Sequence, residues 1–261
     1  MRKGFTLVEL SIVLVILGLL VGSILAGQSL IHAAELRAVG TEYTRYRTAA
    51  YAFRDKYFAL PGDFANATGV WGKDTTYCNS QSGTAATPGT CNGNGDGTLS
   101  VAAGVSQTAE IFQFWKQLQL AGLLEGTFSG IAGPNSTSDS LITVNVPASR
   151  LNPAAWNVTT MGYYVGSAIL YAANYGNVFI IGTATSPGQA ASPNILTSTD
   201  AWNIDTKLDD GAPGTGKVLV RSWNAWGSSS CSTSTSQTDY TGVYNFTFTT
   251  KQCGLYFPNA F

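Results

Sequence analysis

An uncharged apolar segment near the N-terminus constrains the fold of this chain more than any other feature. Residues Leu10–Ala26 contain no charged side chain and consist mostly of Leu, Ile and Val. As a helix, this segment is about 25 Å long, which approaches the thickness of the hydrocarbon core of a bilayer. Arg2 and Lys3 precede it and place the N-terminus on the cytoplasmic side. The sequence therefore predicts one membrane-spanning helix, with the rest of the chain beyond the membrane.

A single carboxylate, Glu9, stands at the start of this apolar segment. Holding a carboxylate in the hydrocarbon region costs about 2.5–3.5 kcal/mol, and such residues usually have a function. A plain membrane anchor leaves Glu9 unexplained. A cleaved secretory signal fits poorly, because Glu9 interrupts the apolar region and no clean Ala-x-Ala site stands near Ala26. Glu9 is therefore a candidate functional residue.

The hexapeptide GFTLVE at positions 4–9, behind a short basic leader, resembles the class III signal of type IV pilins and type II secretion pseudopilins. The resemblance implies that a prepilin peptidase cuts after Gly4, which removes the leader of residues 1–4, and methylates the new amino terminus on Phe5. It also implies that Glu9 meets the N-terminal amine of a neighbouring subunit during assembly. An amine and a carboxylate about 4 Å apart gain roughly 4 kcal/mol at an effective dielectric constant near 20, comparable to the cost of holding Glu9 in lipid.

The same resemblance, which covers about residues 1–30, implies a function and a location. The implied function is that of a structural subunit in a homo-oligomeric helical filament like a type IV pilus, for adhesion, motility, DNA uptake or secretion. The alternative is a type II secretion pseudopilin, or a minor or tip pilin that acts as an adhesive binding module. The precursor is expected to be a bitopic protein of a bacterial inner membrane, with its head in the periplasm. An assembly platform in that membrane then passes it into an extracellular pilus or a periplasmic pseudopilus.

The pattern after the apolar segment predicts that the same helix continues along a globular head. Apolar residues recur there in alternating steps of three and four, with charged residues between them. A Pro-Gly pair at positions 61–62 marks the end of this pattern. We therefore expect one helix over residues 5–58, with residues 5–27 as its transmembrane and assembly half, and a pilin-like head over residues 59–261.

Short strand signals separated by polar turns dominate the head, together with two helical patterns. They predict an α+β fold in which the long N-terminal helix packs on an antiparallel β-sheet, as in type IV pilins. One helical pattern covers Ser106–Leu124, with Ser106 as the N-cap of the helix. The other covers Thr197–Asp210. Strands are expected at Leu141–Val146, Met161–Ala172, Val178–Ile181, Lys217–Trp223, Val243–Thr249 and Gly254–Phe257.

The four cysteines lie in two sequence-local pairs within Gly/Ser/Thr-rich surroundings. Four cysteines allow three connectivities, and the local pairs favour disulfides Cys78–Cys91 and Cys231–Cys253. Disulfides in turn indicate an oxidising compartment. The alternative is four buried thiols in a cytosolic protein, against which the N-terminal segment argues. Neither pair has the CxxC spacing of zinc or thioredoxin-like sites.

Two groups of acidic residues are candidates for calcium, and no other cofactor is expected. Asp96 lies in the segment NGNGDG at positions 92–97, which resembles the first half of a calcium loop but lacks its twelfth-position acid. The alternative is a plain Asn/Gly turn. Asp205, Asp209 and Asp210 lie within six residues, and the alternative there is a charged helix end that Lys207 partly neutralises.

Composition excludes several other function classes. Only 11% of the residues are charged and the net charge is −1, so no nucleic-acid contact is expected. The single histidine, His32, lies between the two halves of the long helix and is interpreted as an interfacial side chain rather than a catalyst. Without a G-x-S-x-G or zinc motif, no enzyme activity is expected. Trp223, Trp226 and Tyr240 form either an adhesive patch or, as we expect, part of a packed sheet.

Overall fold

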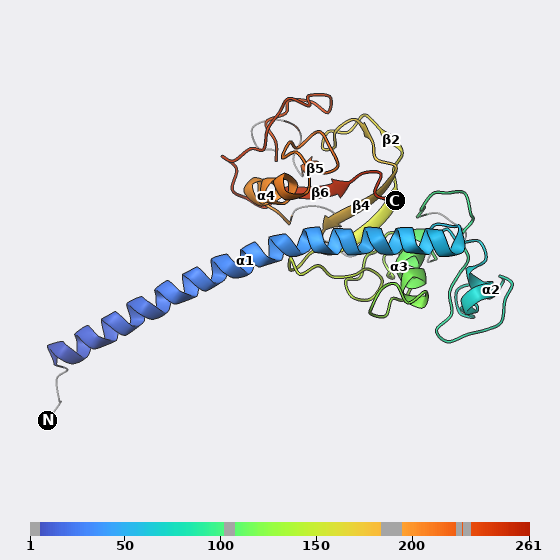
Figure 1. The fold of residues 1–261 in the computed structure, drawn as a ribbon, viewed down its shortest axis with the longest axis horizontal. Coiled ribbons are helices and arrows are strands. Elements are labelled where there is room, and N and C mark those ends of the chain that lie inside the picture. Colours follow the sequence, from blue (N-terminus) through green and yellow to red (C-terminus); the bar gives the residue numbers. More distant parts are fainter. Residues whose placement is uncertain (1–5, 102–107, 184–194, 223–225, 227–230) are drawn as a thin grey trace.

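One long helix organises the whole molecule in the computed structural model, which describes residues 6–101, 108–183, 195–222, 226 and 231–261. Helix α1 (Leu7–Tyr57) runs without interruption for 51 residues. Its N-terminal half projects alone, and its C-terminal half lies along the head (Figure 1). The helix ends where Phe58 adopts a left-handed conformation (φ 52°) and donates its N–H to the carbonyl of Arg54. The predicted single helix is confirmed, to within about two residues at either end.

The head contains an antiparallel sheet, as predicted. Its four strands are β1 (Ala155–Thr160), β4 (Asn177–Gly182), β6 (Cys253–Phe257) and β5 (Leu219–Ser222), in that order across the sheet. The register pairs Val158 with Phe179 and Phe179 with Phe257. A separate two-stranded hairpin comprises β2 (Tyr163–Tyr164) and β3 (Ala173–Asn174). The α+β class with a long helix packed on an antiparallel sheet is therefore confirmed.

Several predicted strands are wrong or much shorter in the structure. Leu141–Val146 folds as a tight turn, because the Asn145 side chain accepts from the Leu141 N–H and donates to two carbonyls. Val243–Thr249 forms no strand beyond an isolated bridge at Tyr244. Of the predicted Met161–Ala172 strand, only Tyr163–Tyr164 forms a strand, and Leu170 adds an isolated bridge to Arg221. Polar side chains in these segments bond to the nearby chain instead of a neighbouring strand.

Strand β1 was not predicted, because its sequence, AWNVTT, shows no alternation of apolar and polar residues. Its first four residues are all buried, because β1 pairs with β4 and contacts α3, and Trp156 packs against Tyr46 of α1. Strand predictions that rest on a period of two detect half-buried strands and overlook fully buried ones.

Three short helices complete the described part of the head: α2 (Ala67–Trp71), α3 (Glu110–Leu120) and α4 (Ser198–Leu208). Helix α3 is shorter than predicted, and Gly122 at φ 74° follows its C-terminal cap. Its predicted cap, Ser106, lies outside the described residues. Helix α4 begins as expected after Thr197, whose hydroxyl accepts the N–H of Asp200 in a reciprocal capping box.

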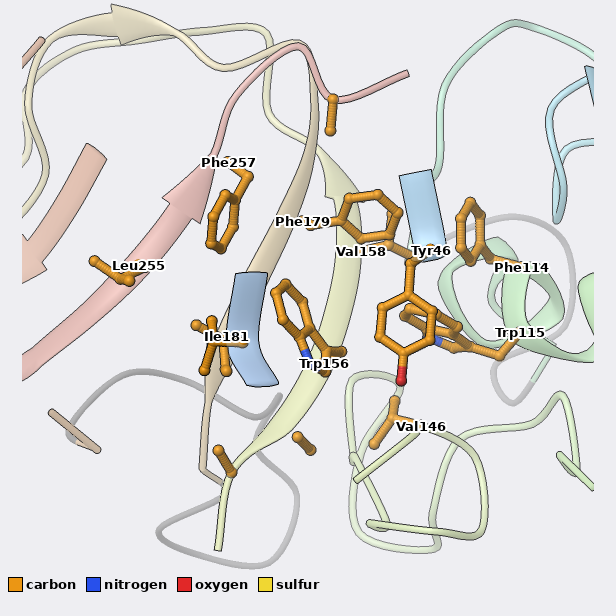
Figure 2. Close-up of a cluster of buried hydrophobic side chains, with 14 of the residues drawn as sticks. Tyr46, Phe114, Trp115, Val146, Trp156, Val158, Phe179, Ile181, Leu255 and Phe257 are labelled. Atoms are coloured by element: carbon orange, nitrogen blue, oxygen red, sulfur yellow. The ribbon is translucent and has the colours of Figure 1, made fainter. Parts of the chain in front are cut away.

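The core is an aromatic cluster between α1, α3 and the sheet (Figure 2). Tyr46 of α1 packs edge-on against Trp115 of α3 and Trp156 of β1, at centroid distances of 5.1 and 5.6 Å. Phe179 of β4 lies at the centre of the same cluster. Burying each such ring stabilises the fold by roughly 1.5–3 kcal/mol. The aromatic stripe of the second half of α1 therefore packs the helix onto the head.

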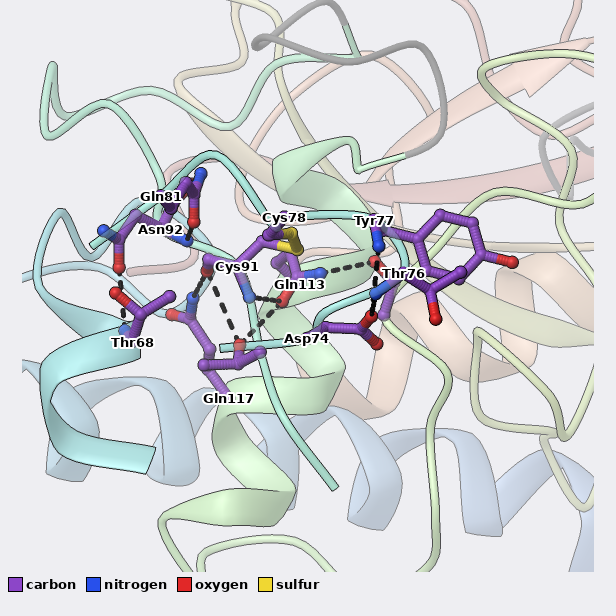
Figure 3. Close-up of a disulfide and its surroundings, with 12 residues drawn as sticks. Thr68, Asp74, Thr76, Tyr77, Cys78, Gln81, Cys91, Asn92, Gln113 and Gln117 are labelled. Carbon is purple, nitrogen blue, oxygen red and sulfur yellow. Dashed lines mark hydrogen bonds between the residues drawn. A yellow bond between two sulfur atoms is a disulfide. The ribbon is translucent and has the colours of Figure 1, made fainter. Parts of the chain in front are cut away.

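Both local cysteine pairs are disulfide-bonded, with Cα–Cα separations of 5.6 Å for Cys78–Cys91 and 5.4 Å for Cys231–Cys253. Two glutamines of α3 hold the first bridge in place (Figure 3). Gln113 accepts the N–H of Cys91, and Gln117 donates to the Cys91 carbonyl. The second bridge ties a polar loop to β6.

Candidate functional site

The N-terminal half of α1 is an apolar surface that no other described segment covers. The large apolar residues from Leu7 to Ile31 are 50% or more exposed, among them Leu7 at 86% and Leu30 at 72%. An 18-residue window of this helix has a mean hydropathy of 2.7, and none of it is buried. Among the described residues, α1 is the one helix long and apolar enough to cross a membrane. Exposure on this scale marks a membrane or protein interface.

Thr6 and Glu9 form a capping box at the tip of this surface. The Glu9 Oε2 atom accepts the Thr6 N–H at 2.8 Å and the Thr6 hydroxyl at 2.7 Å. In return the Thr6 hydroxyl accepts the N–H of Glu9. The box satisfies backbone donors that a helix leaves free at its first turn. The T-x-x-E spacing at positions 6–9 is the sequence signal that could have predicted it.

The candidate assembly carboxylate binds the first described residue after the predicted processing point. Gly4 and Phe5 lie outside the described residues. Glu9 binds the amide of Thr6, one residue after Phe5. Both of its bonds use Oε2, and Oε1 accepts no hydrogen bond from a described residue. Glu9 therefore keeps one oxygen available at the N-terminal end of α1.

His32 marks the point where α1 leaves the head. Its Nε2 atom lies 2.9 Å from Asp200 Oδ1 at the start of α4, and its Nδ1 atom lies 3.7 Å from Glu35 Oε2. The interfacial position expected for His32 thus corresponds to a contact between α1 and α4. Near it, Leu208 of α4 packs over Gly40, where an added Cβ would approach the leucine to 3.0 Å.

Glu42 makes a contact that the sequence pattern did not predict. Its place among the charged residues of the amphipathic stripe indicates a side chain that faces solvent. In the structure its carboxylate accepts from the Ser149 hydroxyl (2.6 Å), the Arg150 N–H (2.9 Å) and Trp156 Nε1 (2.8 Å). These bonds join α1 to β1 and the loop before it. Charge-assisted bonds of this kind are about twice as strong as neutral ones.

The loop of residues 92–97 folds against the carboxylate of Asp63. Asp63 accepts backbone N–H groups of Gly95, Asp96 and Gly97, at 2.6, 3.1 and 2.8 Å. Burial raises the pKa of Asp63 above its usual range, although these three bonds oppose the shift. Asp96 itself accepts from Thr98 and Asn94. The loop thus turns its N–H donors inward, as in backbone sites that bind anions.

The other acidic candidates do come together. Asp205, Asp209 and Asp210 each place a carboxylate oxygen within 4.8 Å of the others, at the C-terminal end of α4. Desolvation raises the pKa of Asp205 to about 7, and the Tyr244 hydroxyl bond opposes the shift. Among the described residues none of the three acids forms an ion pair with Lys or Arg.

Two members of the predicted aromatic group, Trp226 and Tyr240, lie among the described residues, and both pack against another ring. Trp226 lies 4.7 Å from the ring of the buried Tyr171, and Tyr240 stacks on the same ring at 6.1 Å. Trp223 lies outside the described residues. Tyr240 nevertheless stays 40% exposed. Tyr163 and Tyr164 of β2 are also exposed, at 72% and 38%. The sequence contains no signal for their exposure, because they lie inside a predicted strand.

A comparison with known families places a specific motif on the N-terminal half of α1. The family model described as the prokaryotic N-terminal methylation motif matches residues 1–25. No curated protein and no solved structure matches the chain. The matched segment contains the Thr6–Glu9 capping box and most of the exposed apolar surface. Residues 1–25 therefore carry the N-terminal methylation signal of the type IV pilin and pseudopilin families.

Proposed function

We propose that this protein is a structural subunit of a type IV pilus-like filament that polymerises through the N-terminal half of α1. The observation that carries the proposal is the contrast within this helix: an entirely exposed apolar half that bears the methylation motif, and a half packed into the head. An apolar surface of this length needs lipid or other apolar helices around it. In the precursor the membrane supplies them, and in the filament the same halves of neighbouring subunits do.

Processing and assembly act on the tip of the helix. A prepilin peptidase cuts after Gly4 and methylates Phe5, and the assembly platform of the inner membrane extracts the mature subunit. Glu9 then accepts the amine of a neighbouring Phe5 on its available Oε1, while Oε2 keeps the Thr6 bonds. The carboxylate thus caps its own helix and pairs with the neighbour at once. The protein acts as a structural subunit rather than as an enzyme.

Intact-mass spectrometry of sheared surface filaments and of the membrane fraction tests this function. A subunit of an extracellular pilus is expected in the sheared fraction without residues 1–4, with one methyl group on Phe5 and with two disulfides. The same mature mass confined to the membrane fraction points to a pseudopilin or a minor subunit. An uncut leader in both fractions contradicts the proposal.

A second candidate is a minor or tip pilin that binds a surface, and the exposed Tyr163 and Tyr164 favour it. These residues lie on the β2–β3 hairpin, far from the tip of α1 (Figure 1). Replacing both with Ala is expected to reduce adhesion of filament-bearing cells while filament yield stays unchanged. The matched control is Val243→Ala, which removes another exposed apolar side chain of the head. Equal adhesion of both variants and wild type contradicts this candidate.

A further inference from the structure

We propose that Asp205, Asp209 and Asp210 form a binding site for a calcium ion at the C-terminal end of α4. One carboxylate oxygen from each residue lies within 4.8 Å of the others. Oxygens bind Ca²⁺ at about 2.3–2.6 Å, so two ligands of one ion are at most about 5 Å apart. The observed spacing lies inside that limit. This site is separate from the assembly surface of α1, and it stands or falls independently of the proposed function.

An unsatisfied buried oxygen independently indicates a missing ligand. Asp205 is fully buried, and its Oδ1 atom has no hydrogen bond of good geometry among the described residues, although the Gly211 N–H lies close enough to the carboxylate to lower its pKa. A buried carboxylate oxygen without a partner is unfavourable, because it has lost its water and gained nothing in return. Buried charges in proteins are usually paired or coordinate a metal. A cation held between the three acids gives the buried Asp205 carboxylate a positively charged partner.

The charge around the three acids also favours a cation. No Lys or Arg of the described residues forms an ion pair with them. Asp205 and Asp209 stand four residues apart at the end of α4, where the helix dipole presents its negative pole. Carboxylates gathered at such an end repel one another and the helix terminus. Hard oxygen ligands with excess negative charge select Ca²⁺ or Mg²⁺ over softer metals.

Neighbouring donors hold the three carboxylates in position and leave oxygens free. Tyr244 donates its hydroxyl to Asp205 Oδ2 at 2.8 Å. The N–H groups of Lys217 and Val218 both donate to Asp209 Oδ2. Asp210 accepts from the Ala212 N–H and the Thr215 hydroxyl. Asp205 Oδ1 and Asp209 Oδ1 thus accept no hydrogen bond from the described residues, and such outer donors commonly orient the ligands of a metal.

A bound ion would connect three parts of the head. The acids belong to the end of α4 and the start of the loop that leads to β5, and Tyr244 belongs to the loop closed by Cys231–Cys253. Helix α4 in turn packs on α1 through Leu208. Calcium is therefore expected to make α4 and the two loops more rigid, close to the point where α1 leaves the head.

The test uses the full mature chain in detergent micelles, treated with EGTA and then titrated with CaCl₂. We expect a saturable rise in the unfolding temperature, and a smaller rise with MgCl₂ at the same concentration.

Asp209→Asn and Asp210→Asn each remove one charged ligand and are expected to weaken calcium binding at least about tenfold in isothermal titration calorimetry. Asp210 is exposed, so its substitution leaves the core intact. The matched control is Asp239→Asn. Asp239 lies on another loop and also accepts hydrogen bonds from nearby threonines, so this variant is expected to bind calcium with wild-type affinity.

Two results would overturn the site. One is an unfolding temperature and a calorimetric trace that do not respond to CaCl₂. The other is wild-type calcium affinity in Asp210→Asn and Asp209→Asn, with the loss appearing instead in Asp96→Asn. The mass of the same purified sample reports leader cleavage and methylation, so a failure here is distinguishable from a failure of the proposed function.

Discussion

The two halves of α1 belong to one uninterrupted helix but are stabilised in opposite ways. The half from Leu7 to Ile31 packs against no described part of the head and keeps its apolar side chains exposed. The half from Leu36 to Tyr57 buries an aromatic stripe in the core and anchors it with Glu42. The backbone hydrogen bonds are the same in both halves, so backbone geometry does not distinguish them. What distinguishes them is the environment that each set of side chains requires: lipid or identical helices for the first half, and the chain's own head for the second.

The largest expected effect, on filament assembly, concerns Glu9. A substitution there can remove the negative charge and still keep the side chain as a helix cap. In Glu9→Gln the side-chain carbonyl still accepts from Thr6, but the negative charge is gone. Loss of an ion pair worth roughly 4 kcal/mol weakens the contact between subunits by up to about a thousandfold. We therefore expect few or no filaments, measured by shearing and electron microscopy, while the unfolding of the head is unchanged. Normal filament yield from Glu9→Gln would show that Glu9 acts only as a helix cap.

In the second half of the helix, Phe53→Ala is expected to act on stability instead. Phe53 is fully buried, and removing a buried ring costs about 3–5 kcal/mol. Chemical unfolding in micelles, followed by tryptophan fluorescence, measures this loss. Leu19→Ala is the matched control from the exposed half, and it should leave head unfolding unchanged. A similar destabilisation by both substitutions would contradict the division between the halves.

A smaller effect is expected at Glu42. Glu42→Ala leaves the indole N–H of Trp156 and the amide of Arg150 without their acceptor, which costs about 1–3 kcal/mol. Glu42→Gln keeps one acceptor oxygen and is expected to lose less. Unfolding in micelles measures both variants against wild type. Equal stability of all three would mean that the aromatic stripe alone attaches the helix to the head.

The smallest effect tests the boundary at His32. His32→Ala removes the 2.9 Å contact to Asp200, and a partly exposed pair of this kind contributes about 0.2–1 kcal/mol. Hydrogen exchange should rise in α1 close to residue 32 and at the start of α4, with the core unaffected. Glu35→Gln removes only the longer 3.7 Å contact and is expected to have the weaker effect of the two. Increased exchange that extends to Tyr46 would place the boundary deeper in the head.

Local patterns in the sequence predicted the long helix, the exposed apolar half and both cysteine pairs. Each of these depends on residues close together along the chain: an apolar run, a stripe in steps of three and four, and cysteines 13 and 22 residues apart. The methylation motif is local in the same sense, and the family comparison finds it at residues 1–25. The end of the helix at Phe58 also follows from a nearby Pro-Gly pair.

Contacts between distant segments could not be predicted in this way. Glu42 appears in the sequence as one more charge on a helix, and only folding brings Trp156 to it, 114 residues later. Asp96 and Asp205 appear equally suited to calcium in the sequence. The fold surrounds Asp63 with the amides of the loop that contains Asp96, and it buries Asp205 with one oxygen unpaired.

The sequence by itself thus determined where this protein has an apolar helix, where that helix stops and which signal it carries. Hydrophobic periodicity and turn chemistry act over a few residues, so one chain is enough to detect them. Only the tertiary structure decided which strands form, which charges are buried and which acids meet, because burial depends on what the rest of the chain places around a side chain.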